Sequence, residues 1–224
     1  MATATPISYR ALTTRDLAFV PLQCQGEPEE IRARIAACGS SALLAFDGER
    51  CVAQLQFRPF VPGTRSPRGL HDPLYWMDFP PETPALPARA LALFCYHVGQ
   101  LEGDPDSRDR RYLGRGIGQA LLRHTLLWAR DQGFAGVVAK GLAPSWPVLQ
   151  YMGAMPWPVY EAHGFRAVHT YHDADLRQVF DEMLIGAYGA ERLRELEAAV
   201  AQGVDLAALA QVRVYARTLD AAPE

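Results

Sequence analysis

The chain has 224 residues and nearly balanced charge, with 22 Lys and Arg against 25 Asp and Glu and a net charge of −3 at pH 7. Nucleic-acid binding needs concentrated positive charge, so we expect no nucleic-acid partner. Neither a run of about 18 apolar residues nor a charged-then-apolar leader occurs, so we expect no membrane partner and a cytoplasmic protein. The four cysteines lack metal-ligand or disulfide spacing, which favours reduced thiols and predicts no metal site.

The first quarter of the chain is predicted to form strands around one helix. Ile7–Leu12 alternates between apolar and polar residues, as a half-buried strand does. Glu27–Cys38 has helical spacing with Pro28 in its first turn and ends before Gly39. Two apolar runs, 41–46 and 51–57, are joined by Asp47-Gly48-Glu49-Arg50, which predicts a hairpin.

The segment from Pro59 to Pro87 interrupts this pattern with eight prolines and four large aromatic residues. So many prolines exclude a regular helix or a central strand, and so many aromatics are unlike a flexible linker. We therefore predict a long loop packed by its own side chains. Two interpretations stay open, namely a wall of an acceptor pocket and a cover over a sheet edge.

The middle of the chain predicts a strand, a glycine-rich turn and a helix in succession. Ala90–Val98 is apolar enough to be a strand buried on both faces, and Ile117–Arg130 carries apolar residues at helical spacing. Glycines at 114, 116 and 118 let backbone amides approach an anion closely, and the start of a helix adds partial positive charge. Four arginines surround the turn, namely Arg108, Arg110, Arg111 and Arg115. We interpret the turn as a cradle for a small polyanion such as a pyrophosphate.

Two common phosphate-binding motifs do not match this turn. A P-loop needs Lys and then Ser or Thr after its last glycine, where this chain has Gln119 and Ala120. The dinucleotide fingerprint that begins at Gly114 needs a glycine at position 119. A dehydrogenase or methyltransferase remains an alternative, disfavoured because 134–142 lacks the acidic residue expected about twenty residues past such a turn.

The last third predicts two more strands and a helical segment. The apolar run 136–139 is followed by a short helix that ends at Gly164, and 165–172 is a strand candidate. Residues 175–202 carry apolar stripes at helical spacing. Gln211–Thr218 alternates with period two and is interpreted as a closing strand, with a helix continuing to Leu219 as the competing interpretation.

The glycine turn, followed later by Tyr160-Glu161-Ala162-His163-Gly164-Phe165, resembles the GCN5-related N-acetyltransferase (GNAT) superfamily. The family's coenzyme A signature is Arg or Gln, two residues, Gly, one residue, and Gly or Ala, and Gly116 and Gly118 supply its second half. Leu113 stands where the family has Arg or Gln, and a shifted register beginning at Arg111 restores the basic residue. The two motifs together span roughly residues 90 to 171.

The resemblance implies an α/β (α+β) fold, with a mixed, mostly antiparallel central sheet flanked by helices. We expect one domain over 1–224, with 59–87 as a loop insertion and 175–202 as an extra C-terminal helical insertion. The C-terminal helices offer a surface for a homodimer.

The resemblance also implies transfer of an acetyl or other acyl group from acetyl-coenzyme A to a primary amine of a small-molecule or peptide acceptor. Pantetheine would extend the edge of the Ala90–Val98 strand. The expected coenzyme-binding residues are Val98, Leu113, Gly114, Arg115, Gly116, Ile117 and Gly118. Tyr160 matches the family's tyrosine that protonates the departing thiolate.

For the general base, His97 near the end of the same strand is the candidate, because an imidazole titrates near neutrality. Water, or a carboxylate of the 59–87 loop, would serve equally. A non-catalytic acyl-coenzyme A sensor on the same fold is the alternative function.

Overall fold

The computed structural model describes residues 6–60, 88–101, 108–144, 153–172, 190–205, 208 and 210–219. The strands are β1 (Ser8–Ala11), β2 (Ala42–Asp47), β3 (Arg50–Pro59), β4 (Ala90–Val98), β5 (Gly136–Leu142), β6 (Met155–Pro156), β7 (Arg166–His172) and β8 (Gln211–Thr218). The α-helices are α1 (Pro28–Cys38), α2 (Ile117–Asp131), α4 (Trp157–Ala162) and α6 (Ala190–Ala201). Short 3-10 helices are η1 (Asp16–Ala18), η2 (Gln23–Gln25) and η3 (Arg110–Tyr112).

The strands of the described chain form one sheet in the order β1-β2-β3-β4-β5-β8-β7, with β6 beside β5. The pairs β4–β5 and β5–β6 are parallel, and the remaining described pairs are antiparallel. This confirms the expected mixed, mostly antiparallel sheet flanked by helices.

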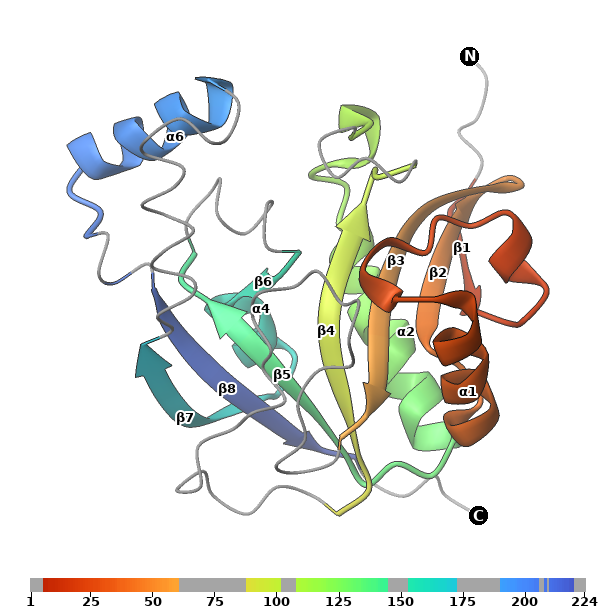
Figure 1. Cartoon of the computed structure of the whole chain (residues 1–224). Helices are drawn as coiled ribbons and strands as arrows, with labels where there is room; N and C mark the ends of the chain where they lie inside the picture. Colours follow the sequence, from red (N-terminus) through yellow and green to blue (C-terminus); the bar gives the residue numbers. More distant parts are fainter. Residues whose placement is uncertain are drawn as a thin grey trace.

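The two central strands pair over a short stretch and then separate. Ala90, Leu91 and Ala92 of β4 lie opposite 136–138 of β5, and beyond this point the strands diverge (Figure 1). The segment that leads into α4 enters the space between them: Gly153 contacts β4, and Met155 pairs with Gly141 of β5. The divergence therefore opens the middle of the sheet at the end of β4.

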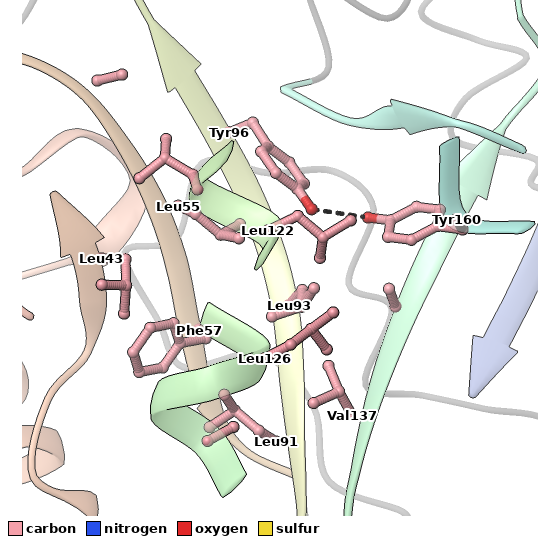
Figure 2. Close-up of a cluster of buried hydrophobic side chains, with 14 of the residues drawn as sticks. Leu43, Leu55, Phe57, Leu91, Leu93, Tyr96, Leu122, Leu126, Val137 and Tyr160 are labelled. Atoms are coloured by element: carbon pink, nitrogen blue, oxygen red, sulfur yellow. Dashed lines mark hydrogen bonds between the residues drawn. The ribbon is translucent and has the colours of Figure 1, made fainter. Parts of the chain in front are cut away.

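Helices cover both faces of the sheet, with α2 behind it and α1 in front in Figure 1. The face of α2 that packs on the sheet carries the predicted apolar residues, since Ile117, Leu121, Leu122, Thr125, Leu126 and Ala129 are all buried. They share a core with side chains of β2–β5, and Figure 2 shows part of it. On the other face, Ile31 of α1 packs in a second cluster with Leu44 and Phe46 of β2.

Several predicted elements are confirmed at the C-terminal end. Gln211–Thr218 is strand β8, so the competing helix that continues to Leu219 is wrong. α6 confirms the later half of the predicted helical segment, whereas 175–184 lies outside the described residues. Whether α6 is an insertion, and whether the chain is one domain, stay predictions.

The predicted loop 59–87 lies almost wholly outside the described residues. Its first residue, Pro59, ends β3, and Phe60 donates a backbone hydrogen bond to the Ala90 carbonyl. Among the described helices, none is long and apolar enough to cross a membrane.

Candidate functional site

The backbone of the glycine turn adopts a conformation that is unfavourable for residues with a side chain. Gly114 and Gly116 have φ of 69° and 74°, in the left-handed region that glycine adopts without steric cost. Gly116 is the N-cap residue of α2, so the free amides of the first helical turn point outward from this position. The partial positive charge of the helix start lies at the same place. The local geometry is therefore suited to holding an anion.

Contacts with two strands fix this turn in place. The Tyr112 hydroxyl donates a 3.0 Å hydrogen bond to Asp47 Oδ2 at the end of β2. The Asp109 amide donates to the Gly99 carbonyl at 2.7 Å, directly after β4. A side chain at Gly99 would place its Cβ 2.6 Å from the Asp109 carbonyl oxygen, so only glycine permits this approach. The turn is thereby held beside the end of β4.

A cavity of about 280 Å³ connects the turn with the opening in the sheet. Its described lining comes from the end of β4, the turn with the start of α2, and the segment that leads into α4. These residues are Tyr96, Val98, Arg108, Tyr112, Leu113, Gly114, Gly116, Ile117, Gly118, Gln119, Gly153, Ala154, Met155 and Pro156. Six of the seven residues that sequence reasoning assigned to coenzyme binding thus line one cavity, and Arg115 lies between two of them.

Positive charge surrounds the turn. The Arg115 guanidinium carbon lies 5.8 Å from the centre of the Tyr112 ring, and its side chain is exposed. Arg111 is paired with Asp109 at 2.6 Å, and the hydrogen bonds from Arg111 hold the pKa of Asp109 down to about 2. Asp109 is thus already neutralised by an arginine, and the exposed Arg115 can face an incoming anion.

One backbone amide at the edge of β4 already forms a hydrogen bond within the chain. The Tyr96 amide donates a 2.6 Å hydrogen bond to the Gly153 carbonyl. Because alternate residues of a strand point their N–H groups to the same edge, the Val98 amide is directed toward this side as well. A ligand that lengthens the strand edge would therefore approach Val98 rather than Tyr96.

Tyr160 lies in the core behind the cavity and does not line it in the described structure. Its side chain is 1% exposed, it stacks on Tyr215 at 5.5 Å, and its hydroxyl donates to the Tyr96 hydroxyl at 3.5 Å (Figure 2). Burial raises the pKa of both Tyr96 and Tyr160 above the ordinary value, so both hydroxyls keep their protons at neutral pH.

Tyr96 lines the cavity and also contacts Tyr160, and sequence reasoning did not single it out. The signal was present in the alternation of the strand, because Tyr96 and Val98 are two residues apart and therefore share a face. Tyr160 is connected to the cavity only through this second tyrosine among the described contacts.

His97 points to the opposite face of β4 from Tyr96 and Val98, as the alternation requires. It is buried and is not among the described residues that line the cavity. Its Nδ1 lies 2.6 Å from Gln100 Oε1, and one ring nitrogen lies within 4.8 Å of the sulfurs of Cys24 and Cys95. The role of His97 as general base stays a prediction.

The fold and the cavity together define a class of protein in which a glycine turn at a helix start faces a divided sheet. No protein-family model matches the chain, and no curated protein matches it. Solved structures do match in shape. The polyamine N-acetyltransferase of Drosophila melanogaster, an enzyme that catalyses the formation of N-acetylagmatine, has a TM-score of 0.53 and 12% identity, over 96% of this chain and 100% of its own.

Two bacterial structures give similar values. An N-acetyltransferase from Staphylococcus aureus Mu50 has a TM-score of 0.49 and 11% identity, over 96% of this chain and 100% of its own. A GNAT-family acetyltransferase from Streptococcus pneumoniae has a TM-score of 0.48 and 14% identity, with the same coverage. The similarity in shape to the Drosophila enzyme shows that the chain has the GNAT fold.

Proposed function

We propose that this protein is an N-acyltransferase that moves an acetyl group from acetyl-coenzyme A to a primary amine. The observation that carries the proposal is the cavity, which joins an anion-binding helix start to the opening between β4 and β5. A molecule with a pyrophosphate at one end and a thin flexible arm matches a cavity of this kind. The donor's acyl end would then reach Tyr96 and Val98.

The pyrophosphate is proposed to lie on the amides from Gly114 to Gly118, with Arg115 as a charged partner. Backbone amides at a helix start bind phosphate without a bulky side chain, so Leu113 in place of Arg or Gln does not remove the main donors. The Leu113 side chain lines the cavity instead. It adds an apolar contact where the family has a polar one.

In the proposed reaction the neutral amine nitrogen attacks the thioester carbonyl carbon. The carbonyl oxygen takes up negative charge and accepts a hydrogen bond from the Val98 amide, which lies at the strand edge. The carbon–sulfur bond then breaks, the sulfur leaves with the electron pair, and the nitrogen of the new amide releases its extra proton to water. The Tyr96 hydroxyl gives its proton to this thiolate and recovers one from solvent, while Tyr160 holds Tyr96 in position.

The acceptor must lose one proton before it attacks. The described lining of the cavity contains no carboxylate or imidazole, because His97 lies on the other face. We therefore assign this proton to water, one of the routes that sequence reasoning left open. Placing donor and amine side by side supplies much of the remaining rate advantage.

Calorimetric titration with acetyl-coenzyme A, with NADH as the control ligand, tests the binding step. We expect micromolar affinity for acetyl-coenzyme A alone. Arg115→Ala should weaken this binding and reduce its dependence on salt, because charge-assisted phosphate contacts are screened by ions.

Arg32→Ala is the matched control, since it removes the same charge from an exposed position on α1. Binding that is unchanged in Arg115→Ala at low salt would contradict the assigned cradle. Thiol release with a panel of amines then separates the enzyme from the alternative, a sensor that binds acetyl-coenzyme A without turnover.

A further inference from the structure

Three ligand-type side chains meet on the face of β4 opposite the cavity. Cys95 and His97 are two residues apart on β4 and share this face, and Cys24 comes from η2, which lies over it. One ligand atom from each residue lies within 4.8 Å of the other two. We propose that Cys24, Cys95 and His97 form a binding site for a thiophilic divalent ion such as Zn²⁺.

The hydrogen bonding of His97 prepares one nitrogen for this role. Nδ1 lies 2.6 Å from Gln100 Oε1, and an amide oxygen only accepts, so Nδ1 carries the ring proton. Nε2 therefore presents a lone pair. The His97 side chain is 95% buried, and Nε2 has no hydrogen-bond partner in the described structure. Metal-binding imidazoles characteristically donate their other ring N–H to an oxygen in this way.

The donor set selects the class of metal. Two sulfurs and one imidazole nitrogen suit Zn²⁺ and related soft ions, whereas Mg²⁺ and Ca²⁺ need oxygen ligands. Neither Cys24 nor Cys95 forms a disulfide in this structure. Bonds of about 2.3 Å to sulfur and about 2.0 Å to nitrogen place such donors within 4 Å of one another in a tetrahedral site. The present separations of at most 4.8 Å are close to that geometry.

The element that carries Cys24 is fixed to the sheet on both sides of the cysteine. Gln54 Nε2 donates to the Pro21 carbonyl at 2.7 Å, and Gln56 Nε2 donates to the Leu22 carbonyl at 3.2 Å. On the other side, Gln25 Nε2 donates to Gln54 Oε1 at 3.2 Å. These glutamines of β3 are buried and neutral, so they position η2 without competing with a metal for the thiolates. A site built on fixed elements in this way is preorganised.

The proposed metal site shares no ligand atom with the proposed transfer reaction, because its three side chains lie on the other face of β4. It does compete with the expectation that His97 is a general base, since Nε2 has a single lone pair. A metal ion on Nε2 would prevent His97 from accepting a proton.

The test is titration of the reduced, chelator-treated full-length protein with Co²⁺ and then Zn²⁺. We expect one ion per chain, a thiolate-to-cobalt charge-transfer band in the near ultraviolet, and loss of that band when Zn²⁺ displaces Co²⁺. Cys95→Ser and His97→Gln should weaken Co²⁺ binding by more than about tenfold, and Gln100→Leu by about ten to a hundredfold through loss of the ring orientation.

Cys51→Ser is the matched control, because this half-buried thiol on β3 is outside the cluster and should leave the titration unchanged. Far-ultraviolet circular dichroism checks that each variant folds, and Cys24→Ser replaces Cys95→Ser if the latter does not. Absence of the charge-transfer band in the reduced wild type would overturn the proposal, as would equal affinity in a folded ligand variant. A Cys24–Cys95 disulfide that forms without reductant, together with no cobalt band after reduction, would identify a redox pair instead.

Discussion

At the scale of single residues, the proposed chemistry depends on two tyrosine hydroxyls arranged in series. Tyr96 lines the cavity, whereas Tyr160 contacts the aromatic rings of Phe165 and Tyr215 and is joined to Tyr96 by the 3.5 Å contact between the two hydroxyls. A buried phenol keeps its proton because burial disfavours the phenolate. Both groups therefore keep their protons over the whole neutral range, and in the proposed reaction the Tyr96 hydroxyl donates to the leaving sulfur.

Tyr96→Phe should lower kcat by about ten to a thousandfold with little change in the affinity for acetyl-coenzyme A, the usual range for loss of one proton-transfer group. Tyr160→Phe should lower kcat by a smaller factor, and the double variant should be no slower than Tyr96→Phe, because the inner hydroxyl acts through the outer one. Steady-state kinetics of thiol release measures all three.

Tyr215→Phe is the control, since its ring also stacks on Tyr160 but its hydroxyl donates to Glu161 at 2.7 Å. A larger loss in Tyr160→Phe than in Tyr96→Phe would return the role of acid to Tyr160.

Sequence reasoning identified the residues that belong to local motifs and missed those that meet only in the fold. The glycine turn and Tyr160 each lie in a short recognisable pattern. Tyr96 has no such pattern, and its importance follows from the bond to Tyr160, which is far along the chain. Cys24 and Cys95 were dismissed on spacing, although η2 and β4 bring them together. Spacing along the chain detects ligands only when they come from one element or one turn.

At the scale of elements, the opening between β4 and β5 depends on the segment that leads into α4. Gly153 has φ of 59°, and its carbonyl oxygen accepts a hydrogen bond from the Tyr96 amide. A Cβ at this position would lie 2.7 Å from Cys95 Sγ and 3.1 Å from the Tyr96 carbonyl oxygen. The segment therefore approaches β4 as closely as only a glycine permits.

Gly153→Ala should lower the free energy of unfolding by about 1–3 kcal/mol, through a strained backbone and displacement of the segment from β4. It should also weaken acetyl-coenzyme A binding, because Gly153 lines the cavity. Urea unfolding and calorimetry measure the two effects.

Gly48→Ala separates strain from contact, because Gly48 has a similar φ of 61° but nothing within 4 Å of the added Cβ. Equal destabilisation in the two variants would show that the close approach to β4 adds nothing to stability.

Most helices and strands could be predicted from the sequence, but the point at which β4 and β5 separate could not. The helix of α2 and the strand of β8 follow from period-3.6 and period-2 patterns that local residues determine. α4 begins at Trp157 because Pro156 and Pro158 flank this residue and their restricted geometry suits the first turn of a helix. By contrast, β4 reads as one uniform apolar strand, and the point where it parts from β5 depends on pairing partners remote in sequence.

At the scale of the whole molecule, the sheet separates two apolar clusters that differ in their polar content. The cluster under α2 contains four buried tyrosines, namely Tyr96, Tyr112, Tyr160 and Tyr215. On the opposite face, buried glutamines and thiols lie between the sheet and η2. The fold thus places weak acids that are neutral at pH 7 on both sides of β4. Because these groups must ionise at alkaline pH, the free energy of unfolding should depend on pH in that range.

The free energy of unfolding should be constant through neutral pH and fall as pH rises above about 9. Burial raises the pKa of the Cys51 thiol to about 11, and burial with a hydrogen bond to Glu161 raises the pKa of Tyr215 to about 12. In the unfolded chain these groups ionise near 8.5 and 10, respectively.

Between the unfolded and folded pKa values the unfolded state binds fewer protons, so each group lowers stability by up to about 1.4 kcal/mol per pH unit. Lys140 is the only lysine of the chain, so the other side chains that titrate in this window are mainly the eight remaining tyrosines and the three remaining cysteines. Urea unfolding at pH 8, 9, 10 and 11 measures the slope, and Tyr215→Phe should make it shallower above pH 10 while leaving it unchanged between pH 8 and 9. A free energy that stays constant up to pH 11 would mean that these side chains ionise in the folded protein without cost, which is incompatible with their burial in two packed clusters.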